Sequence, residues 1–159
     1  MPGEPRPEAL TNPLIRAFLA TRPAFLVASA LPVLLGAAAA QGSGAVDPLL
    51  VVWVLLATVL IHAGINCLND YHDALTGADA LNEDRIHPFT GGSRFIQNEV
   101  LSPRRMARLG WGLLAAGAAI GTLLAVYTGP GLVALGMGGL LLGWAYSGRP
   151  VQLVARGWG

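Results

Sequence analysis

Residues 109–148 read LGWGLLAAGAAIGTLLAVYTGPGLVALGMGGLLLGWAYSG and contain no Asp, Glu, Lys or Arg. A helix on the surface of a soluble protein needs a polar face, and a charge-free run of this length cannot supply two such helices. A charged side chain at the centre of a bilayer costs about 2.5–3.5 kcal/mol, which explains why charges are missing here. The run therefore predicts two membrane-spanning helices, over residues 109–127 and 131–146.

The chain outside this run is also strongly apolar. Of its 159 residues, 53% are hydrophobic and 12% are charged, against the roughly 25% charged residues of soluble domains. Residues 23–68 contain a single charged residue, Asp47. Because a span needs roughly 20 apolar residues, we expect two further spans, over residues 23–40 and 48–73. The predicted fold class is an all-α membrane protein with four transmembrane helices.

Net charge and cysteine content exclude two classes of protein. The formal net charge is +1, so there is no electrostatic reason to expect a nucleic-acid partner. The single cysteine, Cys67, excludes an intrachain disulfide framework. We expect Cys67 to be a small packing residue.

The arginines predict which side of the membrane each connection occupies. All ten basic residues are arginines, and they fall in an N-terminal lead (1–22), within residues 69–108 or after the fourth span. Connections 41–47 and 128–130 contain none. Four spans place the arginine-containing regions on one side, and the positive-inside rule makes that side cytoplasmic. We therefore expect a multi-pass protein of the cytoplasmic membrane with loop 74–103 in the cytoplasm.

Several helix ends and contacts can also be predicted. Ser102 followed by Pro103 is typical of a helix start, and Thr76 followed by Gly77 is typical of a helix end. Three glycines of the fourth span have a spacing that favours close helix packing: Gly136, Gly139 and Gly143.

A polar stripe begins inside the second span. Residues 61–79 read IHAGINCLNDYHDALTGAD, and at 3.6 residues per turn four polar residues fall within an arc of about 60°. These residues are His62, Asn66, Asn69 and Asp73, and Asp70 lies about 60° further round. Polar groups at membrane depth face a bundle interior or a wet cavity. The plainer alternative is a solvated helix end with acids at the interface.

The residue types in this stripe favour magnesium. Asp70, Asp73 and Asp79 offer hard oxygen ligands without a cluster of cysteines or histidines, which suits Mg²⁺ rather than zinc. We expect His62 to be a hydrogen-bonded interior residue rather than a metal ligand.

The loop that follows contains residues suited to anions. Arg85 and Arg94 can bind phosphate oxygens with fork geometry. Residues 90–93, TGGS, could bring backbone N–H groups close to an anion, although a simple turn is the plainer interpretation. Acids on a membrane helix and arginines in the next loop suit a substrate with an apolar tail and a diphosphate head. Metal and arginine would stabilise the leaving oxygens, and an apolar cavity would shield the allylic cation from water.

Three motifs resemble those of one family, the UbiA superfamily of intramembrane prenyltransferases. Residues 69–79, NDYHDALTGAD, resemble its first aspartate-rich motif, most closely in the menaquinone branch of 1,4-dihydroxy-2-naphthoate polyprenyltransferases. Residues 84–97, which include DRI, GGSR and IQ, are similar to a second motif. Residues 146–150, YSGRP, with 156–159, RGWG, are similar to the stretch after the family's fourth helix.

The resemblance implies Mg²⁺-dependent transfer of a polyprenyl group from its diphosphate to an aromatic acceptor. The residues implied as Mg²⁺–diphosphate ligands are Asn69, Asp70, Asp73 and Asp79, with Asp70 and Asp73 as the catalytic pair. The resemblance also implies that Asn66 lines the pocket and that Arg85 and Arg94 bind phosphate oxygens. Tyr146 would face the allylic cation or the acceptor, although a tyrosine at this depth is commonly an interfacial anchor.

One departure from the family is large. The family has a second aspartate-rich motif in its C-terminal half, whereas this chain has no Asp or Glu after Glu99. We therefore expect residues 23–159 to be the N-terminal half of a UbiA-type domain, inactive until a C-terminal half completes the site. Two alternatives remain open: a non-enzymatic membrane subunit that binds a divalent cation or a lipid diphosphate, and a small transporter that uses the acidic stripe.

Overall fold

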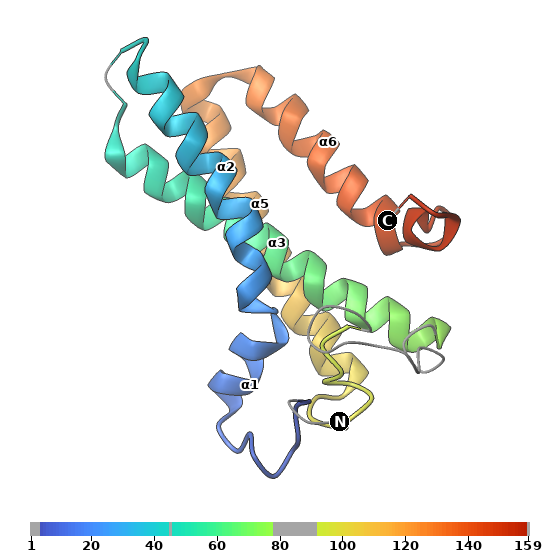
Figure 1. Cartoon of the computed structure of the whole chain (residues 1–159). Helices are drawn as coiled ribbons and strands as arrows, with labels where there is room; N and C mark the ends of the chain where they lie inside the picture. The colour runs from blue at the N-terminus through green and yellow to red at the C-terminus, as the bar shows by residue number, and fades with distance from the viewer. Residues whose placement is uncertain (1–3, 45, 78–91, 159) are drawn as a thin grey trace.

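The computed structural model describes residues 4–44, 46–77 and 92–158. Within these residues the chain is mainly α-helical (Figure 1). The helices are α1 (Pro13–Ala20), α2 (Pro23–Gln41), α3 (Pro48–Thr76), α5 (Pro103–Thr128) and α6 (Pro130–Ser147), followed by a 3₁₀ turn at Leu153–Arg156. Each α-helix has a proline in its first turn, where the missing N–H costs nothing and the fixed φ suits a helix.

Three of the four predicted spans are confirmed by length and hydropathy. Helices α2, α3 and α5 are long and apolar enough to cross a membrane, whereas the apolar helix α6 falls among the shorter ones. The fourth span therefore stays a prediction. Helix α3 continues to Thr76 and α5 begins at Pro103, beyond the predicted membrane spans but at the helix ends that the sequence predicts. The reason is that capping residues, rather than the edge of the apolar run, end these helices.

The predicted helix ends are confirmed. The Ser102 hydroxyl accepts a hydrogen bond from the Arg105 N–H at 3.4 Å, and Gly77 closes α3 with a φ of 76°. At the other end of α3, the Asp47 carboxylate accepts the Leu49 N–H at 2.9 Å. Such caps satisfy backbone groups that a helix terminus leaves without intrahelical partners.

Helix α1 was not predicted. The side chain of Asn12 accepts hydrogen bonds from the N–H groups of Leu14 and Ile15, and Pro13 follows it. Asn before Pro is a helix-start signal, but the helix has only eight residues, too few for a membrane span. The short helix ends at Ala20, which is fully buried.

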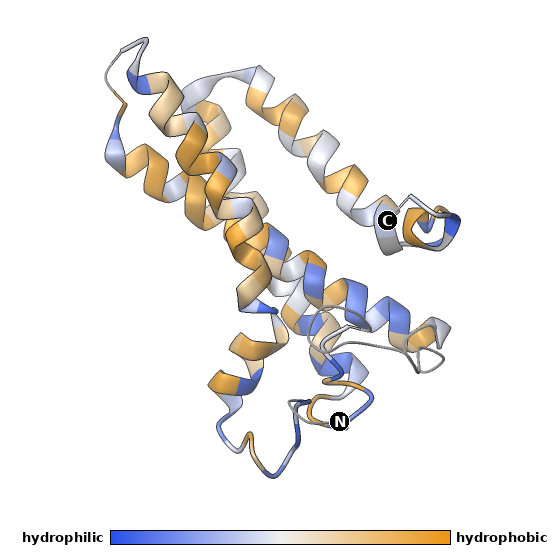
Figure 2. Ribbon diagram, viewed as in Figure 1, coloured by the Kyte–Doolittle hydropathy of each residue, from blue (hydrophilic) through white to orange (hydrophobic). Residues whose placement is uncertain are grey.

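Helices α3 and α5 pack side by side along most of their length, and α2 crosses α3 (Figure 1). The connections α2–α3 and α5–α6 lie at one end of the bundle, and the N-terminal lead lies with residues 92–102 at the other, as the arginine pattern predicts. Which end faces the cytoplasm stays a prediction. Hydrophilic residues gather on the second half of α3 (Figure 2).

A small hydrophobic core lies at the end of the bundle where residues 92–102 meet α3. It is formed by buried residues of α1, α3, the segment after residue 92 and α5, namely Ala20, Cys67, Phe95, Val100 and Met106. Cys67 is fully buried there, so its predicted packing role is confirmed. The core fixes the segment that precedes α5 against the end of α3.

Candidate functional site

Asp70 is the most deeply buried acid of the motif among the residues that the structure describes. Its side chain is 3% exposed. Both of its carboxylate oxygens lie 3.2 Å from the backbone nitrogen of Ser93, which donates its N–H to them. A hydrogen bond to an ionised acceptor is roughly twice as strong as a neutral one. Asp70 therefore ties the end of α3 to the segment that leads into α5.

Thr90 and Gly91 of the TGGS segment lie outside the described residues, and the N–H of Ser93 meets a carboxylate of the protein itself. Gly92 has a φ of 71° and Arg94 a φ of 64°. Between them, the N–H of Ser93 points at the Asp70 carboxylate. Alternating backbone conformations of this kind turn N–H groups toward a negative charge.

Two polar residues in the middle of α3 contact α2 and the residue Thr21 before it. The Asn66 amide donates to the carbonyl oxygen of Thr21 at 2.9 Å, and the His62 Nδ1 lies 2.7 Å from the Ser29 hydroxyl. The expected hydrogen bond of His62 is confirmed, and the residue is half-buried. The pocket role of Asn66 stays a prediction, and its amide has a structural partner between α1 and α2.

Asn69 borders an apolar cavity of about 410 Å³ between α3, α5 and α6. The walls are aliphatic and aromatic, and Asn69 and His72 are at its polar edge. Asp73 is half-buried one turn beyond Asn69, on the same side of the helix at 3.6 residues per turn. An apolar cavity with a few polar groups at one edge suits a ligand with a long apolar part.

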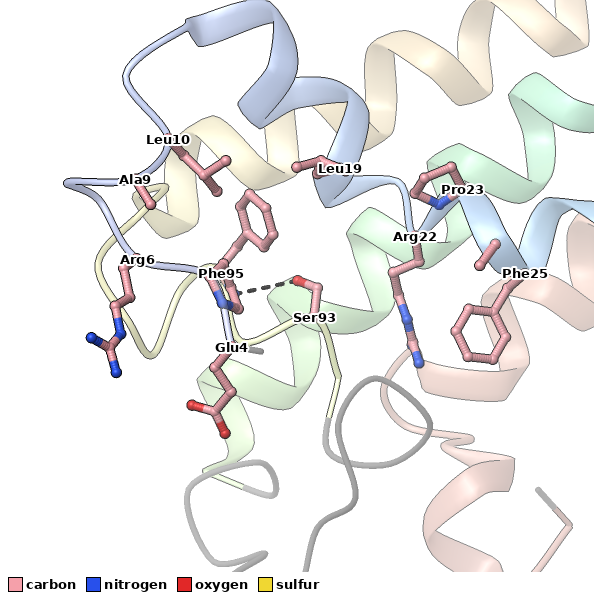
Figure 3. Close-up of a pocket in the computed structure, with 12 residues that line it drawn as sticks. Glu4, Arg6, Ala9, Leu10, Leu19, Arg22, Pro23, Phe25, Ser93 and Phe95 are labelled. Atoms are coloured by element: carbon pink, nitrogen blue, oxygen red, sulfur yellow. Dashed lines mark hydrogen bonds between the residues drawn. The ribbon is translucent and has the colours of Figure 1, made fainter. Parts of the chain in front are cut away.

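A second cavity, of about 420 Å³, lies where the N-terminal lead, α1 and the start of α2 meet Ser93 and Phe95 (Figure 3). The Phe95 ring points toward Leu10. Arg22 has a φ of 58°, and its guanidinium carbon lies 4.7 Å from the centre of the Phe25 ring. Sequence reasoning missed this arrangement because it joins residues far apart in the chain.

Of the remaining predicted site residues, the structure describes Arg94 and Tyr146. Asp79 and Arg85 lie outside the described residues. Arg94 is buried, with 9% of its surface exposed, and Tyr146 is half-buried in the last turn of α6. Within the described residues, no three His, Cys, Asp or Glu side chains gather as a metal site would require.

Comparison with known protein families identifies the family of this chain. The chain belongs to the UbiA prenyltransferase family, whose model matches residues 29–158. The chain is 31% identical over 127 residues to the 1,4-dihydroxy-2-naphthoate octaprenyltransferase of Mycobacterium tuberculosis, an alignment that covers 80% of this chain and 41% of that protein. It is 29% identical over 133 residues to the Bacillus subtilis protein of the same name, over 84% of this chain and 41% of that one.

The similarity extends to other branches of the family. The chain is 36% identical over 94 residues to the chloroplastic chlorophyll synthase of Oryza sativa, over 57% of this chain and 22% of that protein. The chain thus spans about two fifths of the length of the first relatives it matches. No solved structure gives a significant match.

Proposed function

We propose that this chain forms part of an integral-membrane enzyme that transfers a polyprenyl group from an allylic polyprenyl diphosphate to an aromatic acceptor. The observation that carries the proposal is the juxtaposition at the end of α3. Asn69 lies at the edge of the apolar cavity, and Asp73 follows one turn later on the same side of the helix. The buried Arg94 lies one residue from the Asp70–Ser93 contact. The isoprenoid would occupy the cavity, and its diphosphate would lie at the polar edge.

The donor atoms at this edge fit Mg²⁺. Asn69 and Asp73 supply an amide oxygen and a carboxylate, and Asp79 follows in the sequence. Mg²⁺ binds one or two protein carboxylates and takes its other ligands from phosphate and water. When bound, the metal would neutralise charge on the departing diphosphate.

The chain's own residues would bind and orient the substrate. Arg94 and Arg85 would hold phosphate oxygens in the fork geometry of a guanidinium. The aliphatic wall of the cavity between α3, α5 and α6 would keep water from the allylic cation. Asn66 and Tyr146 would border the same space.

The acceptor is proposed to be 1,4-dihydroxy-2-naphthoate or a similar aromatic compound. Two relatives with that substrate in their name align with four fifths of this chain, whereas the chlorophyll synthase aligns with a shorter part. We also propose that acidic residues from the part of the relatives' length not matched here complete the site. The segment alone is then expected to be inactive, and its active site to face the cytoplasm.

The test is an assay of the full-length protein that carries this sequence, in membranes, with a radiolabelled polyprenyl diphosphate and 1,4-dihydroxy-2-naphthoate. We expect transfer that depends on Mg²⁺ and falls at least about 100-fold in Asp73→Ala, because that change removes a group that stabilises leaving-group charge. Asp47→Asn, at the other end of α3, is the matched control and should keep wild-type activity. Full activity in a correctly inserted Asp73→Ala protein would refute the role of Asp73, and no transfer by wild type would refute the function.

A further inference from the structure

Asp70 differs from the other polar residues of the motif in the direction it faces. Asn69 borders the apolar cavity, and Asp73 shares its side of the helix. Asp70 is turned about 100° from Asn69 at 3.6 residues per turn, toward Cys67, which belongs to the buried core. With 3% of its surface exposed, the carboxylate faces the segment before α5 rather than the cavity.

The segment that Asp70 contacts is held on both sides of Arg94. Before Arg94, the Ser93 N–H donates to both oxygens of Asp70 at 3.2 Å. After it, the N–H of Phe95 donates to the Ser93 hydroxyl at 3.3 Å (Figure 3). The Phe95 ring is 4% exposed within the core, and the Phe95 carbonyl accepts the N–H of Val100 at 2.9 Å. Arg94 thus lies between two fixed neighbours.

Arg94 itself has a backbone conformation that a residue with a side chain rarely adopts, with a φ of 64°. Such a conformation persists only where the surrounding contacts impose it. Arg94 is 9% exposed, and its neighbour Ser93 contacts Asp70, in the turn of α3 that also carries Asn69 and Asp73. The Asp70–Ser93 contact joins the residue next to Arg94 to α3.

We propose that Asp70 is a positioning residue, which holds the Ser93–Phe95 turn so that Arg94 meets the diphosphate, and that it is not a ligand of the metal. This inference rests on the proposed function, and it revises the ligand role that the family resemblance implies for Asp70. It assigns different tasks to the two acids of the motif. Asp73 acts on the metal and Asp70 acts through the backbone of the following segment.

The first arm of the test needs neither metal nor substrate. The full-length protein in nanodiscs is treated briefly with trypsin, and the fragment that begins at Phe95 is quantified by mass spectrometry. Cleavage after the buried Arg94 reports the open population of the turn. We expect Asp70→Asn to raise this cleavage at least about tenfold, because the acceptor loses its charge, and Asp70→Ala to raise it further. The matched control, Asp73→Asn, should leave it unchanged.

The second arm separates binding of the diphosphate from binding of the metal. Asp70→Asn is expected to raise the KM for the polyprenyl diphosphate about as much as Arg94→Gln does, while the Mg²⁺ concentration for half-maximal activity stays at the wild-type value. Asp73→Asn is expected to raise that Mg²⁺ concentration. The double variant Asp70→Asn/Arg94→Gln should be no more impaired than Arg94→Gln alone, since both changes remove one interaction.

The outcomes discriminate between the two roles of Asp70. If Asp70→Asn leaves cleavage after Arg94 unchanged and raises the Mg²⁺ requirement as Asp73→Asn does, Asp70 is a ligand and the inference is overturned. If wild type transfers no prenyl group, the proposed function fails. The cleavage arm then still supports Asp70 as the anchor of the turn if Asp70→Asn exposes Arg94, and overturns it if Asp70→Asn does not.

Discussion

Helix α5 and helix α6 are both rich in glycine, but Gly117 of α5 has close neighbours where Gly136, Gly138 and Gly139 of α6 have none among the described residues. A Cβ atom on Gly117 of α5 would lie 2.9 Å from the Ala57 carbonyl oxygen, and one on Gly64 of α3 would lie 2.8 Å from the Gly110 carbonyl oxygen. In α6, a Cβ on Gly136, Gly138 or Gly139 would meet nothing within 4 Å among the described residues. At Gly117 and Gly64, the absence of a side chain lets the backbones of α3 and α5 come into close contact. In α6 these glycines do not form such a contact with the described residues.

The largest expected effect comes from filling the contact between α3 and α5. Gly117→Val should destabilise the protein by about 3 kcal/mol or more, because the new side chain meets the backbone of α3. The measurement is the free energy of unfolding of the full-length protein in detergent micelles.

A matched control lies in the same helix. A Cβ atom on Gly121, one turn further along α5, would meet nothing within 4 Å among the described residues. Gly121→Val changes the same residue type by the same volume, so it separates the steric effect from the loss of helix-forming preference. Equal destabilisation by the two substitutions would show that the α3–α5 contact is not as close as described.

Polar contacts, rather than glycines, join α2 and the residues just before it to α3. The Asn66 amide donates to the Thr21 carbonyl, and Thr21 is buried. Asn66→Ala is expected to cost about 1 kcal/mol, within the range found when a buried carbonyl loses its partner and when hydrogen bonds between membrane helices are removed. The same unfolding measurement tests it.

A companion substitution checks the second polar contact. Ser29→Ala removes the hydroxyl that meets His62 and is expected to cost about 0.6 kcal/mol. If either substitution lowers the free energy of unfolding as much as Gly117→Val does, a single polar contact of α2 stabilises the fold as strongly as the close contact between α3 and α5.

Much of the fold could be predicted from the sequence because lipid imposes a strong, local rule. Charges are excluded from the spans, so the gaps between charged residues mark α2, α3 and α5. Caps are local too, and the predictions at Gly77 and Ser102 are confirmed. Gly136 and Gly139 were predicted to support close packing, and this is wrong within the described residues, where of the three predicted glycines only Gly143 meets a neighbour on another helix, Ile65. Spacing alone does not tell which face of a helix has a partner.

The candidate site could be predicted only in its residue types. Helical spacing grouped Asn69 with Asp73, but it could not show that Asp70 contacts Ser93, because that contact joins residues 23 positions apart in the chain. Nor could it show that the amide of Asn66 reaches back 45 residues to Thr21. Such pairs depend on how the helices cross, and one sequence contains no local signal for them.

The smallest effect is expected in α6. Gly138→Ala adds one methyl group where the described residues leave open space, and alanine favours a helix by up to about 1 kcal/mol over glycine. The unfolding free energy of the full-length protein should therefore stay the same or rise slightly. A loss as large as that of Gly117→Val would mean that another part of the protein packs closely against this face of α6. Gly138 would then permit a close helix contact as Gly117 does. The partner of Gly138 would lie outside the described residues, whereas the partner of Gly117 is α3.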